Sequence, residues 1–240
     1  MQIAWPFFIE SRFYKMKIER IQFYKQGFIE YLMDESSNIP MDKYHFIASW
    51  SENWDLDDLD LKTRFDNTFE NPISTNLWGG SKQSMKSEML RMIDQDKEFM
   101  RVTFANLFQE GKDLGLRLDR FIHHLDEIYK EIKRKDLKAI HHEHNRSNSV
   151  LYLIGAFPQA YCLHDYSSFE RMMVKLESRN IPSEVEIERY FKSMRAIYKV
   201  LTKDDPLVEQ LLAMRCASHK IAYQSNLLVM NDFGKFVSQQ

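Results

Sequence analysis

The sequence predicts an all-α protein, an irregular multi-helix domain of about ten helices. The chain has only 7 Gly and 6 Pro among 240 residues, so residues that break helices are scarce. Apolar side chains recur at spacings of three and four along most of the chain, which is the period of an amphipathic helix. No Asn-Gly or Asp-Gly pair and no long apolar–polar alternation indicates a β-hairpin.

The first half of the chain predicts five helices. The segment before Glu10 lacks the basic residues of a signal peptide and is expected to lead into the first of them. The loop Asn71–Ser84 is predicted from its Pro, paired Gly and serines. The aspartates of Asp55–Asp60 are expected to favour the start of the third helix, and Asp96 is expected to cap the fifth. The apolar stripes are Ile21, Tyr24, Phe28 and Tyr31; Tyr44, Ile47 and Trp50; Leu61, Phe65 and Phe69; Met85, Met89 and Met92; Phe99, Thr103 and Leu107.

The second half predicts a long helix from about Leu116 to Lys135 and several shorter ones. An apolar run, SVLYLIGAF, follows a polar stretch. It is expected to be a helix capped by Ser147 or Ser149, with a buried strand as the alternative. Further stripes begin at Phe169, at a capping box of Ser183 with Glu186, at Pro206 and at Leu227.

Composition indicates one helical domain over residues 1–240. Apolar residues make up 44% of the chain, which suits a packed core. If the domain is bilobed, the junction is expected near residues 139–149. No apolar run is long enough for a membrane span. Cys162 and Cys216 form no disulfide framework, so we expect buried free thiols and a cytoplasmic protein.

A basic run lies at the end of the long predicted helix. The net charge of the chain is −2, which excludes the global positive field of many nucleic-acid-binding proteins. A local basic face can still contact phosphates, although cations also favour a helix C-terminus in proteins with no such partner. The candidate nucleic-acid-binding residues are Lys130, Lys133, Arg134, Lys135 and Lys138.

The stretch HHEHNRS, residues 141–147, is the candidate metal site. On a continuing helix, His141 and His144 would share one face at a spacing of three. Zinc is held by such histidines, but it needs further ligands, and the stretch does not match HExxH. The competing interpretation, which the sequence favours, is a polar loop between helices, in which the imidazoles and Asn145, Ser147 and Asn148 cap neighbouring helices. The nearest other ligands are His123, His124, His164 and Asp165.

No stretch carries an enzymatic signature. The acidic segment from Asp55 fails the EF-hand pattern at its fifth, sixth and twelfth positions. Phosphate-binding, dinucleotide-binding and nucleophile-elbow motifs are absent from the sequence. We therefore predict no catalytic residues and no cofactor, and a non-enzymatic function is favoured. Trp50, Trp54 and Trp78 are candidates for stacking on a base, or for anchoring loops to the core.

Seven stretches in this order resemble a known bacterial region. They resemble the helical N-terminal region that precedes the motor of McrB-type AAA+ GTPases, which act in modification-dependent restriction. The likeness covers most of residues 20–236 and includes no catalytic signature. The stretches are WDLDDLDLKTRFDNTF, NPISTNLWGG, MLRMIDQDKEFMRVTFANLF, LRLDRFIHHLDEI, VLYLIGAFPQAYCLHDYSSFERMM, RYFKSMRAIYKVL and SNLLVMNDF.

This resemblance implies a recognition module, often one for modified DNA, that works with an AAA+ motor protein. The chain has no Walker motif, so NTPase activity is not carried over, and no base-reading residue can be assigned. The leading expectation is a non-enzymatic recognition or assembly module of a bacterial restriction or anti-phage defence system that contacts DNA. The alternatives are a protein-interaction scaffold and a metal-dependent enzyme built on His141–His144.

Overall fold

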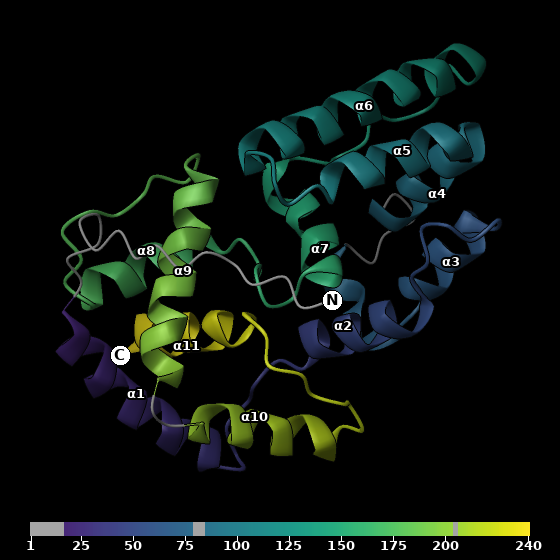
Figure 1. Ribbon diagram of the computed structural model, residues 1–240. Coiled ribbons are helices and arrows are strands. Elements are labelled where there is room, and N and C mark those ends of the chain that lie inside the picture. Colours follow the sequence, from purple (N-terminus) through teal and green to yellow (C-terminus); the bar gives the residue numbers. More distant parts are fainter. Residues whose placement is uncertain (1–16, 79–84, 204–205) are drawn as a thin grey trace.

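The prediction of an all-α fold is confirmed. The computed structural model describes residues 17–78, 85–203 and 206–240 (Figure 1). These ranges contain eleven α-helices, one 3₁₀ helix and no strand. The elements are α1 (Ile18–Met33), α2 (Asp42–Asn53), α3 (Leu61–Thr68), the 3₁₀ helix η1 (Pro72–Leu77), α4 (Met85–Gln95), α5 (Lys97–Leu107), α6 (Leu114–Lys135), α7 (Arg146–Ala156), α8 (Tyr166–Lys175), α9 (Ile187–Thr202), α10 (Leu207–Ser218) and α11 (Val229–Gln239).

Two predicted helix starts are confirmed in atomic detail. The side chain of Asp60 accepts the N–H of Thr63 at 3.1 Å, and that of Asp96 accepts the N–H of Phe99 at 2.9 Å. Each bond satisfies a backbone donor that the first turn of a helix leaves without a partner. The predicted lead-in before Glu10 lies outside the described residues, as does part of the predicted loop Asn71–Ser84.

The prediction that Ser147 or Ser149 caps α7 was wrong, whereas the capping role expected of Asn145 and Asn148 in the loop interpretation is confirmed. Neither serine caps this helix. Instead, Asn145 and Asn148 form a reciprocal capping box, in which each side-chain oxygen accepts the N–H of the other residue at 3.0 and 2.8 Å. The helix therefore begins before Ser147, whose hydroxyl contacts His164, while Ser149 is buried. The apolar run is a helix and not a strand, and it is buried on nearly every side.

The start of α9 also differs from the prediction. The Glu186 carboxylate accepts both the N–H and the hydroxyl of Ser183 at 2.9 Å. These bonds close a turn that precedes the helix, which begins only at Ile187. Glu186 is thus the residue before the first helical turn, not the third residue of that turn.

The helices form two groups (Figure 1). One contains α2–α7 with η1, and the other contains α1 and α8–α11; α6 also contacts α9. A buried cluster links the groups, because Lys43 and Tyr44 of α2 contact Asp232 of α11 at 2.7 Å. The segment 139–149 joins α6 to α7 and therefore lies within the first group.

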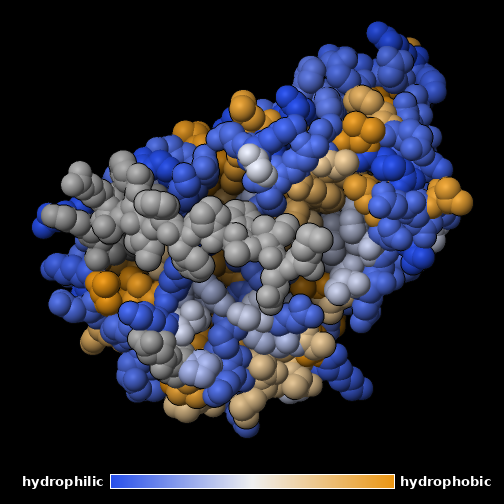
Figure 2. All heavy atoms as spheres, in the orientation of Figure 1, coloured by the Kyte–Doolittle hydropathy of each residue, from blue (hydrophilic) through white to orange (hydrophobic). Residues whose placement is uncertain are grey.

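The arm made by α4, α5 and α6 carries the candidate site. Its inner face is apolar, and Leu118, Phe121 and Leu125 of α6 are buried. Over this arm, most of the surface visible in Figure 2 consists of hydrophilic side chains. Among the described helices, none is both long enough and apolar enough to cross a bilayer. Cys162 and Cys216 are buried free thiols as predicted.

Candidate functional site

The site consists of the C-terminal half of α6 and the loop that follows it. The loop, residues 136–145, turns back along α6 instead of continuing the helix. Two side chains of α6 hold it: the Tyr129 hydroxyl donates to the Ala139 carbonyl at 2.9 Å, and Lys133 Nζ donates to the same oxygen at 2.7 Å. The loop is thereby fixed on the helix.

The candidate basic residues lie at this end of α6, but most already have partners. Lys130 pairs with Glu127 at 2.6 Å, and Arg134 pairs with Glu131. Lys135 donates to the side chain of Gln95 at 2.9 Å. The side chains of Lys130 and Arg134 are 60% and 73% exposed. Exposed pairs of this kind contribute about 0–1 kcal/mol, so a phosphate can displace the glutamates. Lys138 is also exposed.

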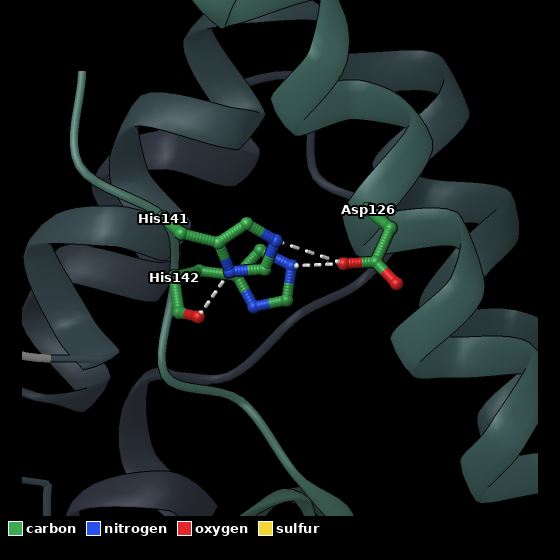
Figure 3. Close-up of side chains that lie close together, drawn as sticks. All are labelled: Asp126, His141 and His142. Atoms are coloured by element: carbon green, nitrogen blue, oxygen red, sulfur yellow. Dashed lines mark hydrogen bonds and ion pairs between the residues drawn. The ribbon is translucent and has the colours of Figure 1, made fainter. Parts of the chain in front are cut away.

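The histidine stretch forms a group of possible metal ligands that the spacing of the histidines in the sequence did not predict. His141 and His142 reach from the loop toward Asp126 of α6 (Figure 3). Their Nε2 atoms lie 3.3 and 3.1 Å from the same oxygen, Asp126 Oδ1. Within the described residues, these three form the group of His, Cys, Asp and Glu side chains close enough to hold one metal ion.

The two histidines differ in environment. The side chain of His142 is 1% exposed, whereas that of His141 is 60% exposed. Burial, reinforced by the neighbouring His141, lowers the pKa of His142. The ring of His141 packs on Tyr129, with 4.6 Å between ring centroids. The site thus has one buried and one solvent-facing imidazole.

His144 does not join this group. The segment is extended, so side chains three residues apart do not share a face as they would on a helix. His144 points into the core, where its Nε2 lies 2.9 Å from the Tyr152 hydroxyl and its ring stacks on that of Tyr152. Its Nδ1 is 3.8 Å from Glu88. Two other histidines make separate contacts: His124 with Thr103, and His164 with Ser147.

The buried imidazole of His144 is expected to make the fold sensitive to acid. Burial lowers the pKa of His144 from 6.5 to about 3. Below pH 6.5 the unfolded chain binds a proton at this residue while the native chain does not, so stability falls as pH falls toward 3. At pH 5 the expected loss is about 2 kcal/mol.

Urea unfolding between pH 7 and pH 4.5, with a chelator present, measures this loss. The variant His144→Gln should reduce the slope of unfolding free energy against pH. The exposed His123 provides the control, since His123→Gln should change the slope far less, acting only through its neighbour His124, whose pKa burial and then His123 lower. Identical slopes for all three proteins would show that His144 is not the source of acid sensitivity.

The tryptophans proposed for base stacking belong to the core. Trp50 and Trp78 are 5% and 4% exposed, and Trp54 stacks on Trp50. Asp126 was missed by sequence reasoning, because it is a polar-face residue of α6 with no motif around it; only the path of the loop brings the histidines to it. Comparison of the chain with protein-family models, with curated proteins and with solved structures finds no match.

Proposed function

We propose that this chain is a non-enzymatic recognition and assembly module that contacts DNA through the C-terminal end of α6. The observation that carries this proposal is the local charge. Residues 130–138 contain five basic and two acidic side chains, a net +3 in a chain whose overall charge is −2. The assignment to a bacterial restriction or anti-phage defence system, with an AAA+ motor protein as partner, is supported by the resemblance of the seven stretches.

The mechanism is electrostatic contact with the DNA backbone. Lys130 and Arg134 exchange their exposed glutamate partners for phosphates, and Lys135 and Lys138 extend the contact along the same end. Neutralising phosphates releases condensed counterions, which makes the affinity fall steeply with salt. Contacts of this kind position a protein on DNA without reading its sequence.

Removing two of these cations is expected to weaken the dependence of DNA binding on salt. For Lys130→Ala with Arg134→Ala, the slope of log Kobs against log salt should become shallower by about 1.8, two phosphate contacts at about 0.9 each. Fluorescence anisotropy with a labelled duplex, methylated and unmethylated, measures the slope.

Lys192 provides a matched control for this test. It lies on α9, its side chain is 55% exposed, and it pairs with Glu188 at 3.0 Å, much as Lys130 pairs with Glu127. The variant Lys192→Ala should bind like the original protein. Absence of binding at low salt, or an unchanged slope in the double variant, would rule out this end of α6 as the contact.

A protein-interaction scaffold is the second candidate function. It is favoured by two apolar side chains on the same loop, Leu137 and Ile140, which are 80% and 58% exposed. Contiguous exposed apolar surface is typical of docking sites, and these two residues are three positions apart in the chain. Co-purification of an AAA+ protein, together with no binding to DNA at low salt, would favour this function over the first.

A further inference from the structure

The tautomer of His141 leaves a lone pair facing a carboxylate. His141 Nδ1 lies 2.7 Å from the backbone oxygen of His142 (Figure 3). A carbonyl oxygen only accepts hydrogen bonds, so Nδ1 carries the ring proton. In the neutral ring, Nε2 is then an acceptor, and it lies 3.3 Å from another acceptor, Asp126 Oδ1. Two facing lone pairs need a cation between them, either a proton or a metal ion.

The second imidazole adds a buried nitrogen aimed at the same point. His142 Nε2 lies 3.1 Å from Asp126 Oδ1, yet within the described residues it has no aligned hydrogen-bond partner. A buried polar atom left in this way costs about 1–3 kcal/mol unless something else satisfies it. A metal ion would satisfy this nitrogen and the lone pair of His141 together.

We propose that Asp126, His141 and His142 bind a divalent transition-metal ion, with zinc as the best fit, through Oδ1 and the two Nε2 atoms. Ligands about 2.0–2.1 Å from a tetrahedral zinc lie about 3.3 Å from one another. The oxygen–nitrogen distances of 3.1 and 3.3 Å already match this spacing. Imidazole nitrogen suits zinc, whereas magnesium and calcium prefer sites made of oxygen.

The surroundings hold the ligands in place. Asp126 lies on α6, and the loop is tied to the same helix through Ala139. The bond from His141 Nδ1 to a backbone carbonyl is the kind of outer contact that orients metal-bound histidines. The ring proton of His142 must move. In the structure its Nδ1 accepts the N–H of His144 at 3.3 Å, so Nε2 carries the proton. When Nε2 binds the metal, this proton moves to Nδ1. Because the new Nδ1–H cannot face the N–H of His144, the imidazole must also rotate as it binds; the ring releases no net proton.

One side of the site remains open. Asp126 and His141 are partly exposed, so a fourth position faces solvent and takes water or a group from a partner. Sites with three protein ligands and an open position are those that react or that accept a fourth ligand from outside, whereas structural zinc sites are usually closed by four protein ligands. The site is therefore suited to joining this chain to another molecule.

The test uses the chain purified without a histidine tag, stripped with a chelator and titrated with zinc chloride by calorimetry. We expect one zinc ion per chain and an increase in Tm. Cobalt(II) should give the visible absorption of a tetrahedral site, and zinc should displace it. Magnesium should not compete. Asp126→Asn and His141→Ala should each weaken zinc binding by at least about tenfold.

The control and the second measurement keep the outcome unambiguous. His123→Ala removes an exposed histidine of the same helix outside the group and should leave zinc affinity unchanged; circular dichroism checks that each variant folds. Nitrogen-15 NMR of the stripped protein reports the protons on His141. Failure to bind one zinc ion would overturn the proposal, and a doubly protonated His141 at pH 7.5 would then show that a proton fills the position instead. Binding that persists in both ligand variants would also overturn it.

Discussion

Replacing Asp232 with asparagine is expected to destabilise the fold by about 3–5 kcal/mol, the usual result of removing one partner of a buried ion pair. Lys43 Nζ donates to Asp232 Oδ1 at 2.7 Å and to the Pro40 carbonyl at 2.8 Å. The side chains of Lys43 and Asp232 are each 4% exposed. Asparagine keeps the shape of the side chain but leaves the ammonium group buried without a counter-charge. Urea unfolding at pH 7 measures the change.

The neighbours of Asp232 make the fold sensitive to loss of its carboxylate. The Tyr44 hydroxyl donates to the other oxygen of Asp232 at 2.7 Å. Burial, and then the charge of Asp232, raise the pKa of Tyr44 well above its ordinary value, so the phenol stays neutral and remains a donor. The carboxylate thus accepts one charged and one neutral donor, from adjacent residues of α2. Loss of the carboxylate therefore weakens the contact between α2 and α11, which joins the two helix groups.

A second variant separates charge from packing. Adding Lys43→Met to Asp232→Asn removes the uncompensated ammonium group and should recover much of the lost stability. Asp94 provides the matched control, because it pairs with Lys62 at 2.6 Å but both side chains are about half exposed. Asp94→Asn should change stability by less than about 1 kcal/mol. Equal effects of Asp94→Asn and Asp232→Asn would show that burial does not govern the Asp232 contact.

Helix caps and apolar stripes could be predicted from the sequence because they depend on residues that are close together in the chain. Asp60 and Asp96 cap helices whose first turn begins at the next residue, so each bond joins residues only three positions apart. The apolar stripes follow from a period that depends only on helix geometry. The same reasoning located α6 to within two residues of its start and at its last residue.

Contacts between residues far apart in the chain could not be predicted from the sequence. Lys43 and Asp232 are 189 residues apart, and the sequence shows only one lysine and one aspartate among many. The expectation that His141 and His144 share a face depended on a continuing helix, whereas α6 ends at Lys135 and the stretch is a loop, as the favoured interpretation expected. The reversal of this loop along α6 places His142 beside Asp126 and sends His144 toward Tyr152. Neighbours of a loop depend on its path, which periodicity does not describe.

Replacing Gly155 with alanine is expected to destabilise the fold by about 3 kcal/mol, although alanine is normally the better helix former by about 1 kcal/mol. Gly155 lies near the end of α7, directly against the indole of Trp50. A Cβ at this position would lie 2.2 Å from Trp50 Cδ2 and 2.3 Å from Trp50 Cε3. Favourable contact between carbon atoms begins at about 3.5 Å, so either the ring or the helix must move.

The indole has little room to move. Trp54 stacks on one face of Trp50 with 4.3 Å between ring centroids, and Phe46 and Phe69 meet it edge-on at 5.8 and 6.1 Å. Close-packed aromatic rings pass a displacement on to their neighbours instead of absorbing it. The strain therefore spreads into the contact between α2 and α7, and urea unfolding should report it as a lower midpoint.

Gly234 gives the matched control, because it is also a buried helical glycine but has space beside it. The nearest side-chain atom to a Cβ there would be Met172 Sδ at 3.6 Å, an ordinary contact. Gly234→Ala should therefore be neutral or stabilise by about 0.5–1 kcal/mol. Trp50→Leu combined with Gly155→Ala should cost less than the sum of the two single changes, because the smaller side chain leaves space for the new methyl group. If the costs of the two single changes simply add in the double variant, the strain does not lie at the indole.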